Sequence, residues 1–198
     1  MPIREIMNYM NSMDDMGQLD MLLALHCAPI INGIKISNLV KLTRKQSIAL
    51  VKILQTSGLS VWFLSCDETD NQTLVFRRKE MQEFLEQKSI QQILKKFGYT
   101  EFGIHQVFWK LTKHMKEYRE GKRDFPHELG ILLGYPIDDV IGFMENQGAN
   151  YSYCGYWKVY SNIEQAKQKF EAYNEVRDAA VFQVLNGYGF MRQKLRKI

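Results

Sequence analysis

The amino-acid sequence predicts an α+β fold that is mainly helical and carries a small antiparallel or mixed sheet. Most of the chain shows apolar residues at helical spacing. Segments 59–65 and 73–78 have instead the β-branched and aromatic composition of strands, and the turn-like DETDNQ between them predicts a hairpin. A third strand is expected at 154–161, far along the chain. Because strands and helices do not alternate regularly, the pattern favours α+β over a doubly wound sheet.

The length of 198 residues predicts a single domain over 1–198. No internal repeat, low-complexity tract or linker-like stretch marks a boundary within it. Residues 1–16 are expected to form a loosely ordered, Met-rich lead-in, and residues 185–198 a basic tail.

The amino-terminal half of the chain carries signals for two helices. The apolar segment 19–29 predicts a helix that ends at Pro29, because proline disrupts a helix interior. Thr43 followed by Gln46 is a capping box and predicts the start of a second helix, closed by Gly58. Its expected buried face carries Ile48, Val51 and Leu54.

Two short helices are expected after the hairpin, the second running from a cap at Ser89 to Gly98. A longer helix over 104–118 is expected to bury one apolar face and to expose a basic one within the segment 110–123. The buried residues predicted there are Phe108, Leu111 and Met115.

The last third contains its own stop and start signals. Segment 124–147 predicts two helices around a turn at 134–136, with Gly134 ending the first and Pro136 opening the second. Asn162 is expected to cap a long amphipathic helix. Its apolar face carries Ile163, Ala166, Phe170 and Tyr173.

Charge and cysteine content restrict the class of protein. A net charge of +4 permits a nucleic-acid partner without requiring one. Three widely spaced cysteines, without a CxxC pair, predict a reducing, cytoplasmic environment rather than a disulfide framework. The sequence contains no run of about 18 apolar residues, so it predicts no membrane span. The amino terminus lacks the apolar core of a secretory signal.

The helical pair within 125–147 has the spacing of a helix-turn-helix. Its second helix, however, presents Asp138, Asp139 and Glu145, and carboxylates repel the phosphates of a duplex. The sequence therefore argues against DNA reading by this element. Asp138 and Asp139 have a simpler interpretation, as first-turn acids that complement the helix dipole.

His127 and Glu128 start a predicted helix, and a histidine beside a carboxylate suits acid–base chemistry or metal binding. The alternative is a helix-start charge and a packed imidazole. Cys27 lies near a predicted helix end, where His26 and Lys35 are the nearby cations, and is either a reactive thiol or a small buried apolar residue. Cys66 and Cys154 are interpreted as structural.

Trp157, Lys158 and Tyr160 alternate along the third predicted strand. An exposed strip of this kind can stack on a base or a cofactor ring, and the alternative is that one side of it belongs to the core. The four histidines are scattered, without HxxxH or CxxC spacing, so no metal site is predicted.

The segments FPHELGILLGYPIDDVIGF and GYWKVY, with Ala166 and Phe170 on the following helix, resemble an uncharacterised bacterial family of about this length, the domain-of-unknown-function family 3793. Weaker matches are Cys27-Ala28-Pro29 followed by Lys35, and a strand ending in Arg77 or Arg78. The resemblance covers about 19–173. It implies no activity, but it raises the weight of Cys27, His127 and Glu128. A further cysteine that the family pattern places late in the last helix is absent here, where Asn174-Glu175 stand.

The leading hypothesis is a small enzyme or ligand-binding protein. Cys27 would be the nucleophile, His127 its base and Glu128 the orienting group. The ligand-binding residues are expected to be Lys35, Arg77, Trp157, Lys158 and Tyr160. One alternative is a regulatory module that binds protein or nucleic acid through 125–147 or the basic face at 110–123. Another is an accessory protein for anionic cofactors, with Trp157 and Lys158 lining a pocket. The sequence identifies no cofactor, favours a small molecule or a protein over nucleic acid as partner, and predicts no membrane association.

Overall fold

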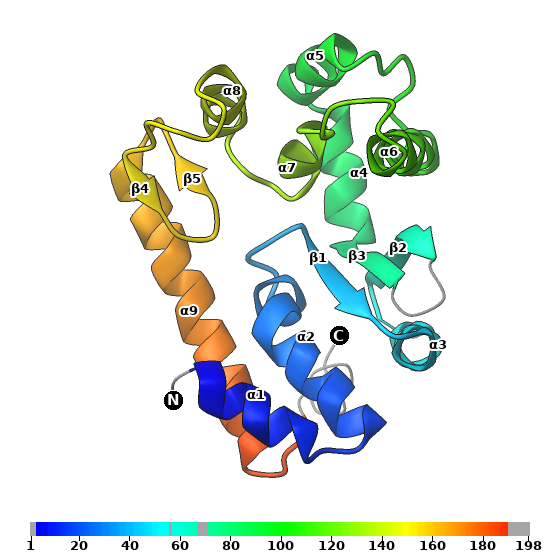
Figure 1. Ribbon diagram of the computed structural model, residues 1–198, viewed down its shortest axis with the longest axis vertical. Coiled ribbons are helices and arrows are strands. Elements are labelled where there is room, and N and C mark those ends of the chain that lie inside the picture. Colours follow the sequence, from blue (N-terminus) through cyan, green and yellow to red (C-terminus); the bar gives the residue numbers. More distant parts are fainter. Residues whose placement is uncertain (1–2, 56, 67–70, 190–198) are drawn as a thin grey trace. The chain divides into compact units, whose positions relative to one another are not determined.

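The computed structural model describes residues 3–55, 57–66 and 71–189 (Figure 1). The chain forms two compact units: Met1–Arg77 with Glu175–Ile198, and Arg78–Asn174. The boundary has no linker, because one unit passes directly into the other at Arg77 and Arg78 and again within a helix. This is why composition marks no boundary there, and the single domain over 1–198 stays a prediction.

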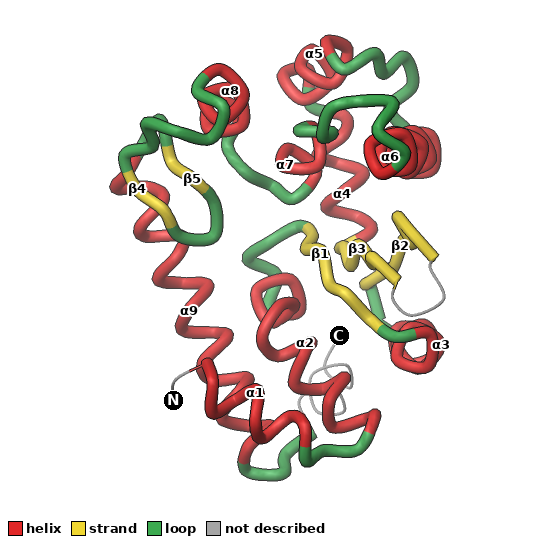
Figure 2. The backbone as a smooth tube through the Cα atoms, viewed as in Figure 1, coloured by secondary structure: helices red, strands yellow, loops and turns green. Residues whose placement is uncertain are grey.

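The first unit packs helices against a three-stranded antiparallel sheet of order β1-β3-β2 (Figure 2). Its elements are α1 (Ile3–Asn11), α2 (Asp15–Ile31), β1 (Ser37–Leu42), α3 (Arg44–Leu54), β2 (Leu59–Cys66) and β3 (Asn71–Arg77), joined by the end of α9 (Ile163–Leu185). The β2–β3 hairpin confirms the strands predicted at 59–65 and 73–78. The turn was expected over 67–72, but Asn71 and Gln72 belong to β3, and residues 67–70 lie outside the described part of the chain.

The end of α2 and the amino-terminal segment differ from the sequence-based expectation. Helix α2 does not end at Pro29 but continues to Ile31, with Asn32 as its C-cap. Proline lacks an N–H and disturbs only the turn before it, so a proline in the last turn is compatible with a helix that ends shortly afterwards. Within 1–16, expected to be loose, Ile3–Asn11 form α1, which buries Ile6 and Met10.

The capping box at Thr43 and Gln46 is confirmed, with both reciprocal hydrogen bonds present at the start of α3. Its predicted buried face is confirmed at Leu54 and wrong at Ile48 and Val51, which are 52% and 39% exposed, while Leu50 is fully buried. The helix also ends at Leu54, before Gly58. The other buried residues of α3 are Gln46, Ser47 and Leu54.

The second unit is mainly helical and ends in a small hairpin. Its elements are α4 (Arg78–Glu86), α5 (Lys88–Lys96), α6 (Ile104–Arg119), α7 (Glu128–Leu132), α8 (Ile137–Glu145), β4 (Tyr153–Cys154), β5 (Lys158–Val159) and the first half of α9. The predicted long helix, with Phe108, Leu111 and Met115 buried, is confirmed in α6. The helical pair around 134–136 is confirmed in α7 and α8.

The strand predicted over 154–161 is wrong in length. Only Tyr153–Cys154 and Lys158–Val159 pair, as two short antiparallel strands joined by a turn. The helix expected to start at Ser89 begins instead at Lys88, with Gln87 at its N-cap. Asn162 does cap α9, accepting a hydrogen bond from the Gln165 N–H at 3.0 Å.

Candidate functional site

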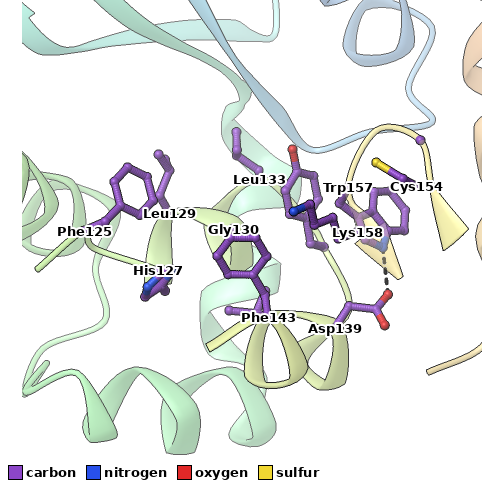
Figure 3. Close-up of a pocket in the computed structure, with 13 residues that line it drawn as sticks. Phe125, His127, Leu129, Gly130, Leu133, Asp139, Phe143, Cys154, Trp157 and Lys158 are labelled. Atoms are coloured by element: carbon purple, nitrogen blue, oxygen red, sulfur yellow. Dashed lines mark hydrogen bonds between the residues drawn. The ribbon is translucent and has the colours of Figure 1, made fainter. Parts of the chain in front are cut away.

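A cavity of about 370 Å³ lies in the second unit, between the α7–α8 pair and the β4–β5 hairpin (Figure 3). Figure 3 shows His127 and Phe125 toward one end of its lining and Lys158, Trp157 and Cys154 toward the other, with Phe143 between them. Aromatic and aliphatic side chains provide most of the wall. The lining residues are Phe125, His127, Leu129, Gly130, Leu133, Tyr135, Asp139, Val140, Phe143, Cys154, Gly155, Trp157 and Lys158.

Glycines allow the elements around this cavity to approach closely. A Cβ at Gly142 of α8 would lie 2.6 Å from the Cβ of Tyr160, and a Cβ at Gly155 would lie 2.4 Å from the Phe170 ring. Gly134, with a φ of 80°, makes the left-handed turn that separates α7 from α8. Glycines of the two family motifs, FPHELGILLGYPIDDVIGF and GYWKVY, therefore position the cavity walls.

Asp139 of α8 joins that helix to the hairpin. One carboxylate oxygen, Oδ2, accepts the indole N–H of Trp157 at 2.7 Å. The other, Oδ1, accepts the backbone N–H groups of Tyr160 and Ser161 and the Ser161 hydroxyl, each at 2.8 Å. Asp139 is only 2% exposed. Its role is thus a specific link between two elements, which goes beyond the dipole complement that its helical position suggests.

Trp157 is held rigidly in the cavity wall. Besides its bond to Asp139, the indole stacks on Tyr135, with ring centroids 5.0 Å apart, and meets the Phe170 ring edge-on at 4.4 Å. Fixed rings of this kind keep a pocket open without a ligand, because the side chain has no freedom to fold into the space. Trp157 is therefore a core residue and a lining residue at once.

Lys158 brings a positive charge to the cavity. Its Nζ donates a hydrogen bond to the Gly148 carbonyl at 2.6 Å and lies 5.6 Å and 4.8 Å from the ring centroids of Phe143 and Tyr151. In the described part of the chain no carboxylate forms an ion pair with it. The ammonium is held by neutral groups, so its charge remains available to a ligand.

His127 lies at the start of α7 and lines the same cavity. Its ring contacts those of Phe125 and Phe143, with centroids 5.4 Å and 5.5 Å apart. Partial burial lowers the pKa of the imidazole from its ordinary value, against the opposing charges of Glu128 and Asp124. The neutral imidazole, which can donate and accept one hydrogen bond each, is therefore favoured.

Glu128 points into the protein and is completely buried. Its Oε1 accepts a hydrogen bond from His114 Nδ1 at 2.6 Å and a longer one from the Tyr99 hydroxyl at 3.4 Å. Burial, followed by the charge of Glu128, raises the pKa of Tyr99. The second carboxylate oxygen of Glu128, Oε2, has no donor among the described residues. This carboxylate is engaged with His114, whereas the sequence predicts that it orients His127.

Sequence reasoning did not select His114 or Cys154. His114 falls on the apolar face of α6, together with Leu111 and Met115, and a histidine at a core position is a signal for a buried acidic partner. Cys154, interpreted as structural, is an exposed free thiol that lines the cavity. It is the cross-strand neighbour of Lys158.

Cys27 and Lys35 lie together in the first unit. Cys27 is fully buried, and burial raises the pKa of its thiol to about 12 although the charge of Lys35 acts in the opposite direction. Burial also lowers the pKa of Lys35 to about 8, and that ammonium donates a hydrogen bond to Asn38 Oδ1 at 2.8 Å. At neutral pH the Cys27 thiol is therefore protonated and enclosed.

The remaining predicted ligand-binding residues also have structural contacts. Arg77, at the end of β3, donates from Nη1 to the Ile30 carbonyl at 3.2 Å. Tyr160 packs its ring against Gly142, and its buried hydroxyl has no partner among the described residues. Neither residue belongs to the lining of the cavity.

The structure thus brings together His127, Trp157 and Lys158 in one cavity of the second unit. Cys27, Lys35 and Arg77 belong to the first unit. The proposed pairing of Cys27 with His127 joins residues of different units and stays a prediction.

The basic segment 110–123 pairs part of its charge internally. Two glutamates lie within 4 Å of four of its cations, at distances of 3.8 Å for Lys113–Glu117, 3.8 Å for Lys116–Glu120, 2.6 Å for Lys122–Glu120 and 3.9 Å for Arg123–Glu117. Six lysine and arginine residues against two glutamates leave the segment with a net charge of +4, with histidine counted as neutral. Nucleic-acid binding by this segment therefore stays a prediction.

Within 3–55, 57–66 and 71–189, no group of three or more His, Cys, Asp or Glu side chains is placed to hold a metal ion. Over the same residues, no helix combines the length and the apolar character that a membrane span requires.

Comparison with known proteins identifies the family. A model of the family described as "Protein of unknown function (DUF3793)" matches residues 23–192. Neither the curated proteins nor the solved structures contain a match to the chain. The match extends over most of the sequence, so the chain belongs to the DUF3793 family, as the resemblance of its motifs predicted.

Proposed function

We propose that this DUF3793 protein binds a small organic anion with an aromatic or otherwise apolar body, in the cavity between α7–α8 and the β4–β5 hairpin. The observation that carries the proposal is the Lys158 ammonium, which lies beside an apolar cavity without a carboxylate partner in the described chain. The site is supported as a binding site, and the proposal assigns no reaction to it.

The open hydrogen-bonding capacity around the cavity favours an anion. Asp139 is the only carboxylate among its lining residues, and four donors already occupy its two oxygens. Lys158 is the lining cation, and its contacts are a carbonyl and two aromatic rings. A carboxylate, sulfonate or phosphate would therefore gain a charge-assisted hydrogen bond without displacing an existing ion pair.

The size and the walls of the cavity define the rest of the ligand. A volume of about 370 Å³ is near the lower end of the range for small-molecule pockets. It equals the liquid volume of roughly a dozen water molecules. Walls made by Phe125, Leu129, Leu133 and Phe143 suit a compact ring system. His127, toward the other end of the lining from Lys158, offers a second polar contact (Figure 3).

We also propose that the protein resides in the bacterial cytoplasm. Cys27 and Cys154 are both free thiols, and Cys154 is exposed. A reducing compartment keeps such a thiol from oxidation.

The test compares two fluorescent probes that differ in charge. 1-Anilinonaphthalene-8-sulfonate carries an anionic sulfonate, and N-phenyl-1-naphthylamine has the same ring system without it. Both are titrated into the full chain at neutral pH. The proposal predicts that the sulfonate binds more tightly, by about tenfold for one charge-assisted hydrogen bond in a partly exposed site.

Two variants connect this preference to Lys158. Lys158→Met keeps an apolar stem but removes the charge, so the sulfonate should lose about tenfold in affinity while the neutral probe binds as before. Lys167→Met, on α9 and outside the cavity lining, is the matched control and should change neither affinity. Near-ultraviolet circular dichroism confirms that packing is intact in each variant. Equal affinity of wild type and Lys158→Met for the sulfonate would refute the proposal.

A further inference from the structure

A second hollow lies at the start of α6, away from the lining of the first cavity. Its volume is about 480 Å³, and its lining comes from the loop before α6 and from the first turns of that helix. The lining residues are Tyr99, Thr100, Glu101, His105, Gln106, Trp109 and Lys110. None of them lines the cavity between α7–α8 and the hairpin, so the two sites are separate.

Trp109 is the notable member of this groove. It is 61% exposed, although tryptophan is one of the side chains that gain most from burial. His105 and Gln106 precede it by four and three residues, so all three share one face of α6 at the edge of the groove. An open indole face beside a groove of ligand size is a stacking platform for a flat ring.

The polar groups of the groove are suited to the edge of such a ring. Gln106 offers a side-chain amide, which both donates and accepts, and Thr100 and Glu101 add a hydroxyl and a carboxylate. The Tyr99 hydroxyl is engaged with Glu128, so this residue contributes its ring to the groove. An amide pairs with the adjacent acceptor and donor that adenine presents.

The charges that line the groove balance, because Lys110 is the one lysine and Glu101 the one carboxylate among its lining residues. Lys110 donates to the Gly98 carbonyl and lies 5.2 Å from the centroid of the Tyr99 ring, so neutral groups hold its ammonium, as they hold that of Lys158. Farther along α6, Lys113 and Lys116 have glutamates as partners at 3.8 Å. A lining without an excess of positive charge favours a neutral ring over a phosphorylated ligand.

We propose that this groove binds a purine ring, as the free base or the nucleoside, stacked on Trp109 and held at its edge by Gln106. The proposal does not depend on the anion site, because it uses different residues and a different kind of ligand. It adds a second small-molecule site to the same unit.

The positions of the three tryptophans make the test specific. Trp109 is in the groove, Trp157 is in the wall of the first cavity, and Trp62 lies in β2 of the first unit. Adenosine is titrated into the full, ¹⁵N-labelled chain, and the three indole N–H signals are followed by NMR. We expect adenosine to shift the Trp109 signal and to leave those of Trp157 and Trp62 in place.

Two variants test the stacking contribution. Trp109→Ala should weaken adenosine binding at least about fivefold, which is the lower end of what base–aromatic stacking contributes. Because Trp109 is exposed, this variant is expected to fold, and circular dichroism checks that it does. Tyr118→Ala removes another exposed aromatic ring of the same helix outside the groove, and should leave adenosine binding unchanged.

Several results would overturn the proposal. Adenosine that shifts no indole signal at millimolar concentration excludes a purine site, and a shift confined to Trp157 assigns adenosine to the other cavity. Glucose that shifts Trp109 as strongly as adenosine shows that the groove does not select an aromatic ring. Binding of oligoadenylate that tightens steeply with length and weakens with salt would indicate a nucleic-acid surface in place of a nucleoside site.

Discussion

The buried ammonium of Lys35 should make the stability of the protein depend on pH in a defined way. Lys35 is 6% exposed, and burial lowers its pKa from 10.5 to about 8. Between these two values the unfolded chain binds more protons than the folded one, so stability rises with pH through this window. Replacing Lys35 with methionine removes the titrating group and retains most of the side-chain volume.

The magnitude follows from the two pKa values. Between pH 7 and pH 9, a group with a pKa of about 8 in the folded state and 10.5 in the unfolded state contributes about 1.4 kcal/mol of added stability. The wild type should therefore gain about 1.4 kcal/mol relative to Lys35→Met over this interval. At pH 7 the variant is expected to be at least as stable as the wild type, because an apolar side chain replaces a buried charge.

Urea unfolding followed by circular dichroism at pH 7, 8 and 9 measures the difference between the two proteins. The thiol of Cys27, whose pKa burial raises to about 12, titrates in both of them, so its effect largely cancels in the comparison. Lys52→Met, at an exposed position of α3, is the control and should show no pH-dependent difference from wild type. If the difference between wild type and Lys35→Met stays constant from pH 7 to 9, the ammonium is not buried as described and the reasoning fails.

Further predictions concern the other buried and close-packed groups. Iodoacetamide at neutral pH should modify the exposed Cys154 and should spare the buried Cys27 until urea is added. Peptide mass spectrometry measures both modifications. Rapid modification of Cys27 in the folded chain would support its role as a nucleophile. Asp139→Ala should lower the free energy of unfolding by about 3–5 kcal/mol, since it leaves buried donors without an acceptor. A loss below about 1 kcal/mol, measured by urea unfolding, would contradict the link between α8 and the hairpin. Gly142→Ala should destabilise the folded protein by about 1–3 kcal/mol, because the new Cβ would lie 2.6 Å from a neighbouring carbon. Gly58→Ala, with open space around it, is the control and should change the thermal midpoint little. Equal effects of the two substitutions would refute the close approach at Gly142.

Sequence patterns predicted those elements of the fold that local signals determine. The capping box at Thr43, the hairpin of β2 and β3 and the stop at Gly134 all depend on residues close together in the chain, and the structure confirms each one. The buried face of α3 was predicted correctly only at Leu54, because apolar spacing in a short helix fits two faces and only the packed neighbours select one. Strand β1, a short segment without strong alternation, was not predicted at all.

The candidate site was predicted only in part, because local motifs mark some of its residues whereas tertiary packing determines their partners. The alternation of aromatic and lysine side chains in GYWKVY drew attention to Trp157 and Lys158, and both line the cavity. The partner of Trp157 could not be found this way, since Asp139 precedes it by 18 residues and the bond depends on tertiary packing. His114, 14 residues before Glu128, is a similar case, and so the sequence assigned the carboxylate to the neighbouring His127 instead.

The hydrogen bonds that the cavity can offer a ligand depend on how its nearest buried carboxylates are used. Asp139 is held by the hairpin and Glu128 by His114, so these two buried acids meet donors within the protein. Lys158 meets only neutral groups in the described chain. The Asp139 carboxylate keeps its negative charge when neutral N–H and O–H groups donate to it, but its four hydrogen bonds use its acceptor capacity and add rigidity to the wall. The segment that contains Asp139 and Glu128 therefore shapes the cavity, and Lys158 supplies the ammonium on which the proposed anion site depends.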